Sequence, residues 1–212
     1  MGRDSTSIQP NRSVVMSRVL LLSGGVDSAC IAAWQRPEHC LSINYGQKAA
    51  AAEQRSAAAI AAHLELSFTH ITVDAAAASA AIPSPGPASD DDAVLWWPYR
   101  NQLLITLAAA WAVAHGHIEV LIGTVAGDGD RHADGRQEFY DAMTALLQVQ
   151  EGSLAVAAPA ISLSTPELID VSAVDDSTLG WTHSCHLGDV PCSRCAGCTK
   201  RAEVLLRAGR LQ

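Results

Sequence analysis

Short apolar runs alternate along the chain with longer segments of helical period. The runs of strand length occupy residues 19–22, 41–44, 68–73, 119–124 and 155–161. Helices are predicted over residues 28–35, 48–63, 100–115 and 137–150. A further helix begins at Thr165, the expected N-cap, with Pro166 at its first helical position. Because parallel strands need helix-length crossovers, this order predicts an α/β fold with a doubly wound parallel sheet.

Composition divides the chain into three parts. Residues 1–15 are polar and predict a flexible N-terminal extension. Residues 16–180 carry the alternating pattern and form the expected main domain, whereas residues 181–212 combine four cysteines with a terminal helix. Residues 74–92 lose all periodicity, and their prolines and consecutive aspartates predict a solvated loop. Such a loop is either an inert surface excursion or an active-site lid.

Composition and charge limit the class of protein. With 212 residues and 49% hydrophobic content, the chain can bury one core and carry an appendage. Its formal net charge of -8 argues against broad nucleic-acid binding, which needs a basic surface, and favours small ligands or a protein partner. No apolar run is long enough to cross a membrane, and no signal-peptide core is visible. The sequence therefore predicts a cytoplasmic protein.

The first strand leads into a glycine-rich turn, Ser23-Gly24-Gly25-Val26-Asp27-Ser28, which opens the first helix. The first amides of a helix lack intrahelical partners and carry the positive end of its dipole, so this turn predicts a phosphate site. Gly24 and Gly25 permit close approach of the backbone, and Ser23 and Ser28 add hydroxyl donors. Asp27 is expected to cap the helix or to bind magnesium. The alternative is a tight turn that happens to be rich in glycine.

A second polar segment, residues 123–136, follows the fourth strand. In a doubly wound sheet the ligand crevice opens where the winding reverses, and the fourth strand is the expected neighbour of the first on that side. Asp128, Asp130, Asp134 and Arg136 are therefore candidates to contact a purine or magnesium, although such loops are often merely solvated. Arg100 is a candidate partner for a carboxylate or phosphate, or else part of a surface salt bridge.

Four cysteines crowd the C-terminal part, at Cys185, Cys192, Cys195 and Cys198. Their compact spacing suits four thiolates around a tetrahedral zinc ion, and a site with four sulfur ligands leaves no position for catalytic water. We therefore interpret the zinc as structural. An iron–sulfur cluster and uncoordinated thiols are the alternatives. Lys200 and Arg201 are candidates to balance the negative charge of the thiolates.

The six-residue turn resembles the pyrophosphate loop, Ser-Gly-Gly-x-Asp-Ser, of the N-type ATP pyrophosphatases, or PP-loop enzymes, whose fold is of the adenine nucleotide alpha hydrolase type. Further segments narrow the resemblance to one family. They are Tyr45-Gly46-Gln47, Pro98-Tyr99-Arg100-Asn101, Ala133-Asp134-Gly135-Arg136 and the four-cysteine tail. In order and spacing, residues 18–201 are similar to the 7-cyano-7-deazaguanine synthase family, called QueC.

The resemblance implies an ATP-dependent carbon–nitrogen ligase. ATP activates the carboxylate of 7-carboxy-7-deazaguanine as an adenylate, ammonia forms the amide, and a second activation dehydrates the amide to the nitrile, a precursor of queuosine. The implied cofactors are ATP, Mg²⁺ and Zn²⁺, and family members are commonly homodimers.

The resemblance also implies roles for residues of this chain. The implied catalytic residues are Ser23, Asp27, Ser28 and Arg100. The implied nucleotide-binding residues are Leu22, Ser23, Gly24, Gly25, Val26, Asp27, Ser28, Tyr45, Gln47 and Gly123. The implied substrate-binding residues are Arg100, Asn101, Asp128, Asp134 and Arg136, and the metal ligands are the four cysteines.

The chain departs from the family pattern at three places. Where the family usually has Thr/Asn-Lys-Ala-Glu, this chain has Thr165-Pro166-Glu167, so a lysine that would stabilise the transition state is absent. Residues 131–136 keep an aspartate and an arginine but lose the family's cysteine, and Cys185-His186-Leu187-Gly188 replaces Cys-Tyr-Asn-Gly. These changes fall around the activated group rather than on the nucleotide loop.

Two other functions follow from this pattern. QueC-like relatives in antiphage defence of the type IV CBASS kind attach a deazaguanine to an amine of a partner protein, and this chain could do the same. The other is a non-catalytic module that keeps the nucleotide and metal sites. Longer PP-loop synthetases and tRNA thiolation enzymes are disfavoured by the negative charge and the four-cysteine tail.

Overall fold

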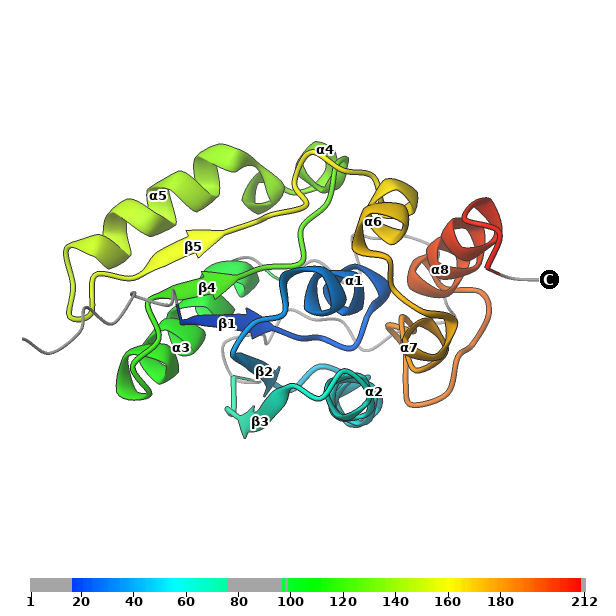
Figure 1. Ribbon diagram of the computed structural model, residues 1–212, viewed down its shortest axis with the longest axis horizontal. Helices are drawn as coiled ribbons and strands as arrows, with labels where there is room; N and C mark the ends of the chain where they lie inside the picture. The colour runs from blue at the N-terminus through cyan, green and yellow to red at the C-terminus, as the bar shows by residue number, and fades with distance from the viewer. Residues whose placement is uncertain (1–16, 76–96, 98, 211–212) are drawn as a thin grey trace, which may run out of the picture.

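The computed structural model describes residues 17–75, 97 and 99–210 (Figure 1). The strands are β1 (Arg18–Leu21), β2 (His39–Asn44), β3 (Ser67–Thr72), β4 (Glu119–Leu121) and β5 (Ala155–Ala157). They form one parallel sheet in the order β3-β2-β1-β4-β5. The predicted doubly wound α/β fold is therefore confirmed, with β4 beside β1 where the winding reverses.

The helices are α1 (Val26–Gln35), α2 (Ala50–His63), α3 (Arg100–Ala114), α4 (Asp128–Arg131), α5 (Gln137–Gln148), α6 (Thr165–Ser172), α7 (Asp176–Gly180) and α8 (Ala196–Arg207), with a 3₁₀ helix at Ala133–Gly135. Helices α1, α2, α3, α5, α6 and α8 follow predicted segments with small shifts at their ends, whereas α4, α7 and the 3₁₀ helix were not predicted. The last two predicted strands are shorter than expected, since β4 ends at Leu121 and β5 at Ala157. The chain beyond each strand end turns away to form the site described below.

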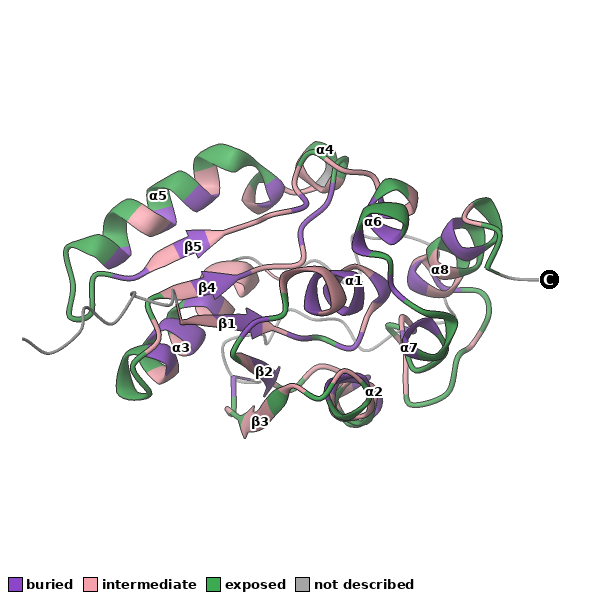
Figure 2. Cartoon of the chain, viewed as in Figure 1, coloured by how far each residue is buried: buried purple, intermediate pink, exposed green. Residues whose placement is uncertain are grey.

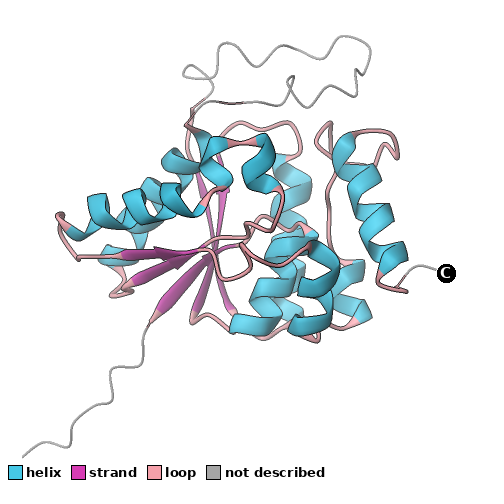
Figure 3. Ribbon diagram, turned by 90° about the horizontal axis from the view of Figure 1, so that it is seen from above, coloured by secondary structure: helices cyan, strands magenta, loops and turns pink. Residues whose placement is uncertain are grey.

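Two apolar cores enclose the sheet (Figures 2 and 3). Side chains alternate between the faces of a strand, so Leu20 packs into the core with α1, α2 and the C-terminal helices, whereas Val19 packs into the core with α3 and α5. Both side chains are fully buried. Helices thus cover both faces, and the continuous apolar runs of the strands reflect burial on two sides.

The C-terminal helices lie at the carboxyl end of the strands. Helix α6 packs against α1 and α8, and α7 also contacts α1 (Figure 1). The tail therefore covers the end of the sheet at which the glycine-rich turn opens.

One detail of the sequence interpretation is wrong. The N-cap of α6 is Ser164 rather than Thr165, because the Ser164 hydroxyl and the Glu167 carboxylate satisfy each other's backbone amides in a capping box. Thr165 is the first helical residue and is buried.

Other expectations lie outside the described residues or stay predictions. The extension at residues 1–15 is outside the described part, as is most of the predicted loop at residues 74–92. The division between residues 180 and 181 stays a prediction. In the part of the chain that the structure describes, no helix has both the length and the apolar character needed to cross a bilayer.

Candidate functional site

The glycine-rich turn lies between the end of β1 and the first turn of α1. Gly25 is the N-cap of α1 and provides no side-chain hydrogen bond to the helix start. The Ser28 hydroxyl donates to the Gly25 carbonyl at 3.1 Å and lies 3.1 Å from the Ser23 hydroxyl. The uncapped amides, the positive end of the helix dipole and the two hydroxyls are groups that favour an anion.

Gly24 fixes the path of this turn. Its φ of +82° lies in the left-handed region, and a Cβ there would meet the Glu53 carbonyl oxygen and the Ser56 Cβ of α2, both at 2.8 Å. Its carbonyl accepts a hydrogen bond of 2.9 Å from the amide of His183. The turn is therefore held between α2 and the chain that leads into the cysteine tail.

Gly123 brings the fourth strand against the turn, as the crossover rule predicts. A Cβ on Gly123 would lie 3.4 Å from the Cα, Cβ and nitrogen of Ser28, so the absence of a side chain lets the two backbones approach. This contact places residues 123–136 beside the first turn of α1.

Asp27 is the acidic centre of the site, and its side chain is 22% exposed. Its Oδ1 accepts a hydrogen bond of 2.7 Å from the Thr165 hydroxyl, and its Oδ2 lies 3.4 Å from Nζ of Lys200. Burial raises the pKa of Asp27, an effect that Lys200 and Thr165 oppose and that the nearby Asp128 reinforces. Thus three chain segments far apart in sequence meet at one carboxylate.

Two of these partners were given other roles by the sequence. Thr165 was expected to cap α6, and Lys200 to balance the thiolates, yet both bind Asp27. No local pattern around Lys200 indicates a partner 173 positions away.

Tyr45, Gln47 and Arg100 gather on the α2 side of the turn, together with Glu53. The amide of Gln47 donates to the Glu53 carboxylate at 2.8 Å, and its carbonyl accepts from the Tyr45 backbone amide at 2.9 Å. Burial raises the pKa of both Tyr45 and Glu53, and the positive charge of Arg100 partly offsets each rise. Sequence reasoning missed Glu53, which lies in an alanine-rich helix. Asn101 follows Arg100 in the first turn of α3.

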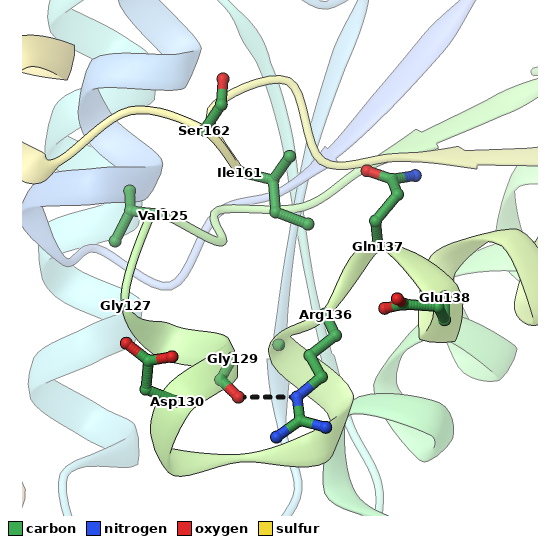
Figure 4. Close-up of a pocket in the computed structure, with 10 residues that line it drawn as sticks. Val125, Gly127, Gly129, Asp130, Arg136, Gln137, Glu138, Ile161 and Ser162 are labelled. Carbon is green, nitrogen blue, oxygen red and sulfur yellow. Dashed lines mark hydrogen bonds between the residues drawn. The ribbon is translucent and has the colours of Figure 1, made fainter.

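A cavity of about 410 Å³ opens where the chain leaves β4 and β5 (Figure 4). Its lining residues are Val125, Gly127, Gly129, Asp130, Gly135, Arg136, Gln137, Glu138, Ile161 and Ser162. The Arg136 side chain donates from Nε to the Gly129 carbonyl at 2.9 Å. Of the predicted substrate residues, Arg136 lines this cavity, whereas Asp128 lies between the lining residues Gly127 and Gly129 and 4.0 Å from Lys200.

The four cysteines form a compact thiol cluster. The sulfur atoms of Cys185, Cys192, Cys195 and Cys198 all lie within 4.8 Å of one another. The Cys192–Cys198 and Cys185–Cys195 separations are both 4.0 Å, close to the roughly 3.8 Å edge of a tetrahedron with zinc–sulfur bonds of about 2.3 Å. Amide donors lower the pKa of Cys192 to about 6, which favours the thiolate. The residues present therefore fit a tetrahedral metal ion.

The cluster is joined to the phosphate loop through the backbone. Cys195 caps the N-terminus of α8, and a Cβ on Gly197 would lie only 1.9 Å from the carbonyl oxygen of Ser184. The preceding residue, His183, bonds to Gly24. The adjacent residues His183 and Ser184 therefore connect the glycine-rich turn to the start of α8, where Cys195 of the thiol cluster lies.

Comparison with known proteins agrees with this architecture. A sequence model described as "Queuosine biosynthesis protein QueC" matches residues 17–209. A protein of Dechloromonas aromatica named 7-cyano-7-deazaguanine synthase is 32% identical over 90% of this chain and 94% of its own length. A protein of the same name from Koribacter versatilis is 29% identical over 90% of this chain and 89% of its own length.

A solved structure supports the fold alone. The NMN synthetase of Francisella tularensis is similar over 93% of this chain and 79% of its own, with a TM-score of 0.50 and 17% identity. The sequence matches carry the family assignment, because the model covers most of the described chain. The resemblance that the motifs indicated is confirmed, and this chain is an enzyme that belongs to the QueC family.

Proposed function

We propose that this enzyme activates the carboxylate of 7-carboxy-7-deazaguanine with ATP and transfers the activated acyl group to ammonia. The observation that carries the proposal is the turn at Ser23–Ser28, whose uncapped helix start and two hydroxyls lie against Gly123. The chain that follows Gly123 lines a cavity of about 410 Å³, which is large enough for a bicyclic base. The names of the relatives support the 7-cyano-7-deazaguanine product. In this proposal the β- and γ-phosphates lie on the turn, and the base lies toward Arg136.

The first step makes an acyl-adenylate. A carboxylate oxygen bonds to the α-phosphorus of ATP, the bond from that phosphorus to the bridging oxygen breaks, and pyrophosphate leaves with the electron pair. Ammonia then attacks the acyl carbon, and AMP departs to leave the amide and one proton. In a second round the amide oxygen bonds to the α-phosphorus of another ATP, and pyrophosphate leaves again. The bond from the former amide carbon to the AMP oxygen then breaks, and the nitrogen loses its two protons to give the nitrile.

The chain's own residues favour this chemistry by electrostatics and position. The amides at the start of α1 and the hydroxyls of Ser23 and Ser28 would bind the phosphate oxygens, since anions are favoured at a helix N-terminus. Asp27 and Asp128 are the proposed carboxylate ligands for magnesium, which supplies charge neutralisation when bound. Arg100 would orient the substrate carboxylate. The four cysteines would hold a structural zinc, and assembly as a homodimer is part of the proposal.

Isotopic labelling tests the reaction directly. The protein is incubated with ATP, magnesium, ammonium and substrate that carries ¹⁸O in both carboxylate oxygens, and the products are analysed by mass spectrometry. We expect AMP and pyrophosphate, with one ¹⁸O in each AMP and none in the nitrile. Release of ADP, or AMP without label, would refute adenylation of the carboxylate.

The same experiment addresses the alternatives. Omission of ammonium should stop the reaction after adenylation, so that product forms only when a nitrogen nucleophile is added. A candidate partner protein that gains the mass of the acyl group would instead identify protein conjugation, for which the departures around Asp134 and at Cys185–Gly188 are the motivating observation. Binding of ATP without AMP formation under any of these conditions would identify a non-catalytic module.

A further inference from the structure

Lys200 occupies an unusual place for a charged residue of a metal-binding tail. The chain has only two lysines, Lys48 and Lys200. From the second turn of α8, Lys200 reaches Oδ2 of Asp27 at 3.4 Å and Oδ1 of Asp128 at 4.0 Å. It therefore bridges the first residues of α1 and of α4, on the two sides of the crevice.

The ion pairs of Lys200 with Asp27 and Asp128 leave part of its side chain exposed. Asp27 and Asp128 are also the proposed carboxylate ligands for magnesium, so with the metal bound the Lys200 ammonium would be left to the phosphate oxygens of the triphosphate. The Lys200 side chain remains 45% exposed, so its three donors are not used up by the carboxylates. An ammonium at this edge of the turn is accessible to an anionic ligand that enters the crevice.

The backbone around Lys200 holds it in place. Its neighbour Arg201 donates to the Thr182 hydroxyl at 3.0 Å and to the Leu179 carbonyl at 3.1 Å. On the other side, Cys198 belongs to the thiol cluster. The contacts of Arg201 and Cys198 therefore fix the part of α8 from which the Lys200 side chain extends.

We propose that Lys200 is a phosphate-binding catalytic residue, with its ammonium placed by the cysteine tail to contact the β- and γ-phosphates of ATP and stabilise the departing pyrophosphate. This inference rests on the proposed function. While the α-phosphorus gains its bond to the acyl oxygen, the bridging oxygen takes the electron pair and its charge grows. A lysine ammonium that contacts this leaving group stabilises the transition state more than the ground state.

Binding measurements separate this role from a structural one. Lys200→Met removes the charge and keeps the length of the side chain, Lys200→Arg keeps the charge, and Arg207→Gln removes one exposed charge from the same helix. The ligands, measured by calorimetry, are pyrophosphate, MgATP and AMP. We expect Lys200→Met to weaken the binding of pyrophosphate and of MgATP about tenfold or more and to leave the affinity for AMP unchanged. Lys200→Arg should lie between Lys200→Met and wild type, and Arg207→Gln should match wild type.

Kinetics extend the test to the reaction. For Lys200→Met we expect kcat for AMP formation to fall about 10²-fold with the melting temperature and bound metal retained. The double variant Thr165→Lys/Lys200→Met returns an ammonium to Asp27 from its other side, so recovery of pyrophosphate affinity would support the proposal.

Two results would overturn the inference. One is a Lys200→Met protein that binds pyrophosphate as tightly as wild type does, and the other is one whose affinity for AMP falls by the same factor as its affinity for pyrophosphate. If wild type itself forms no AMP from the deazaguanine, the proposed function fails. The contrast between pyrophosphate and AMP still decides the role of Lys200.

Discussion

Replacement of Gly24 by alanine should destabilise the whole protein, because the turn has no room for a methyl group. The left-handed φ of +82° costs an alanine about 1–2 kcal/mol. The new Cβ would also lie 2.8 Å from both the Glu53 carbonyl oxygen and the Ser56 Cβ, and such overpacking costs about 1–3 kcal/mol. The expected loss is therefore about 2–5 kcal/mol, a large part of the roughly 5–15 kcal/mol that stabilises a typical domain.

Gly25→Ala is the matched control. Gly25 has a φ of -78°, and its Cβ would meet nothing closer than the Ser23 hydroxyl at 3.5 Å. We expect Gly25→Ala to change the free energy of unfolding by no more than about 1 kcal/mol. Urea denaturation followed by tryptophan fluorescence measures both variants, with comparable slopes confirming that the midpoints report stability. Equal midpoints for the two variants would show that Gly24 does not pack on α2 as described.

Three further substitutions probe the site and its supports. Asp27→Ala should abolish AMP formation with metal content unchanged, and unchanged turnover would remove Asp27 from the site. Ser164→Ala removes the capping box and should lower stability by about 1 kcal/mol, a melting-temperature shift of roughly 2–4 °C; a larger shift would contradict a purely local cap. The Thr178 amide helps lower the pKa of Asp175 to about 2, so this stabilisation is present above the unfolded pKa and is lost as pH falls toward 2. Asp175→Asn should flatten the dependence of stability on pH between about 4 and 2, and an unchanged slope would contradict it.

Local patterns predicted the sheet because the inner strands are buried on both faces, whereas the edge strand β3 is only half-buried. Apolar runs separated by helix-length segments allow few strand orders when the strands are parallel and their crossover connections are right-handed. The position of β4 beside β1 follows from this rule. Strand ends were less predictable. Ile122 is apolar like the residues before it, yet β4 ends at Leu121. The following α4 and 3₁₀ helix are too short to show a helical period in the sequence.

The site was predictable where one segment makes it and unpredictable where distant segments meet. The glycine-rich turn and the cysteine cluster each lie within one short segment of the sequence, so residue spacing alone predicted them. The capping-box spacing from Ser164 to Glu167 was also available and would have identified Ser164 as the N-cap. No spacing relates Thr165 or Lys200 to Asp27, because those contacts form only when the sheet and the tail are both folded.

This dependence on distant segments links the tail to the glycine-rich turn. Within the turn, hydrogen bonds join Ser23, Gly25 and Ser28, but none of them involves Gly24, whose φ is positive, or the Asp27 side chain. These two parts of the turn are held by the His183 amide on the Gly24 carbonyl and by Thr165 and Lys200 on Asp27. Two of these three contacts come from the tail segment that contains the thiol cluster. The cysteine tail therefore does more than cover the end of the sheet. Its His183 amide binds the Gly24 carbonyl of the glycine-rich turn, and its Lys200 ammonium contacts Asp27.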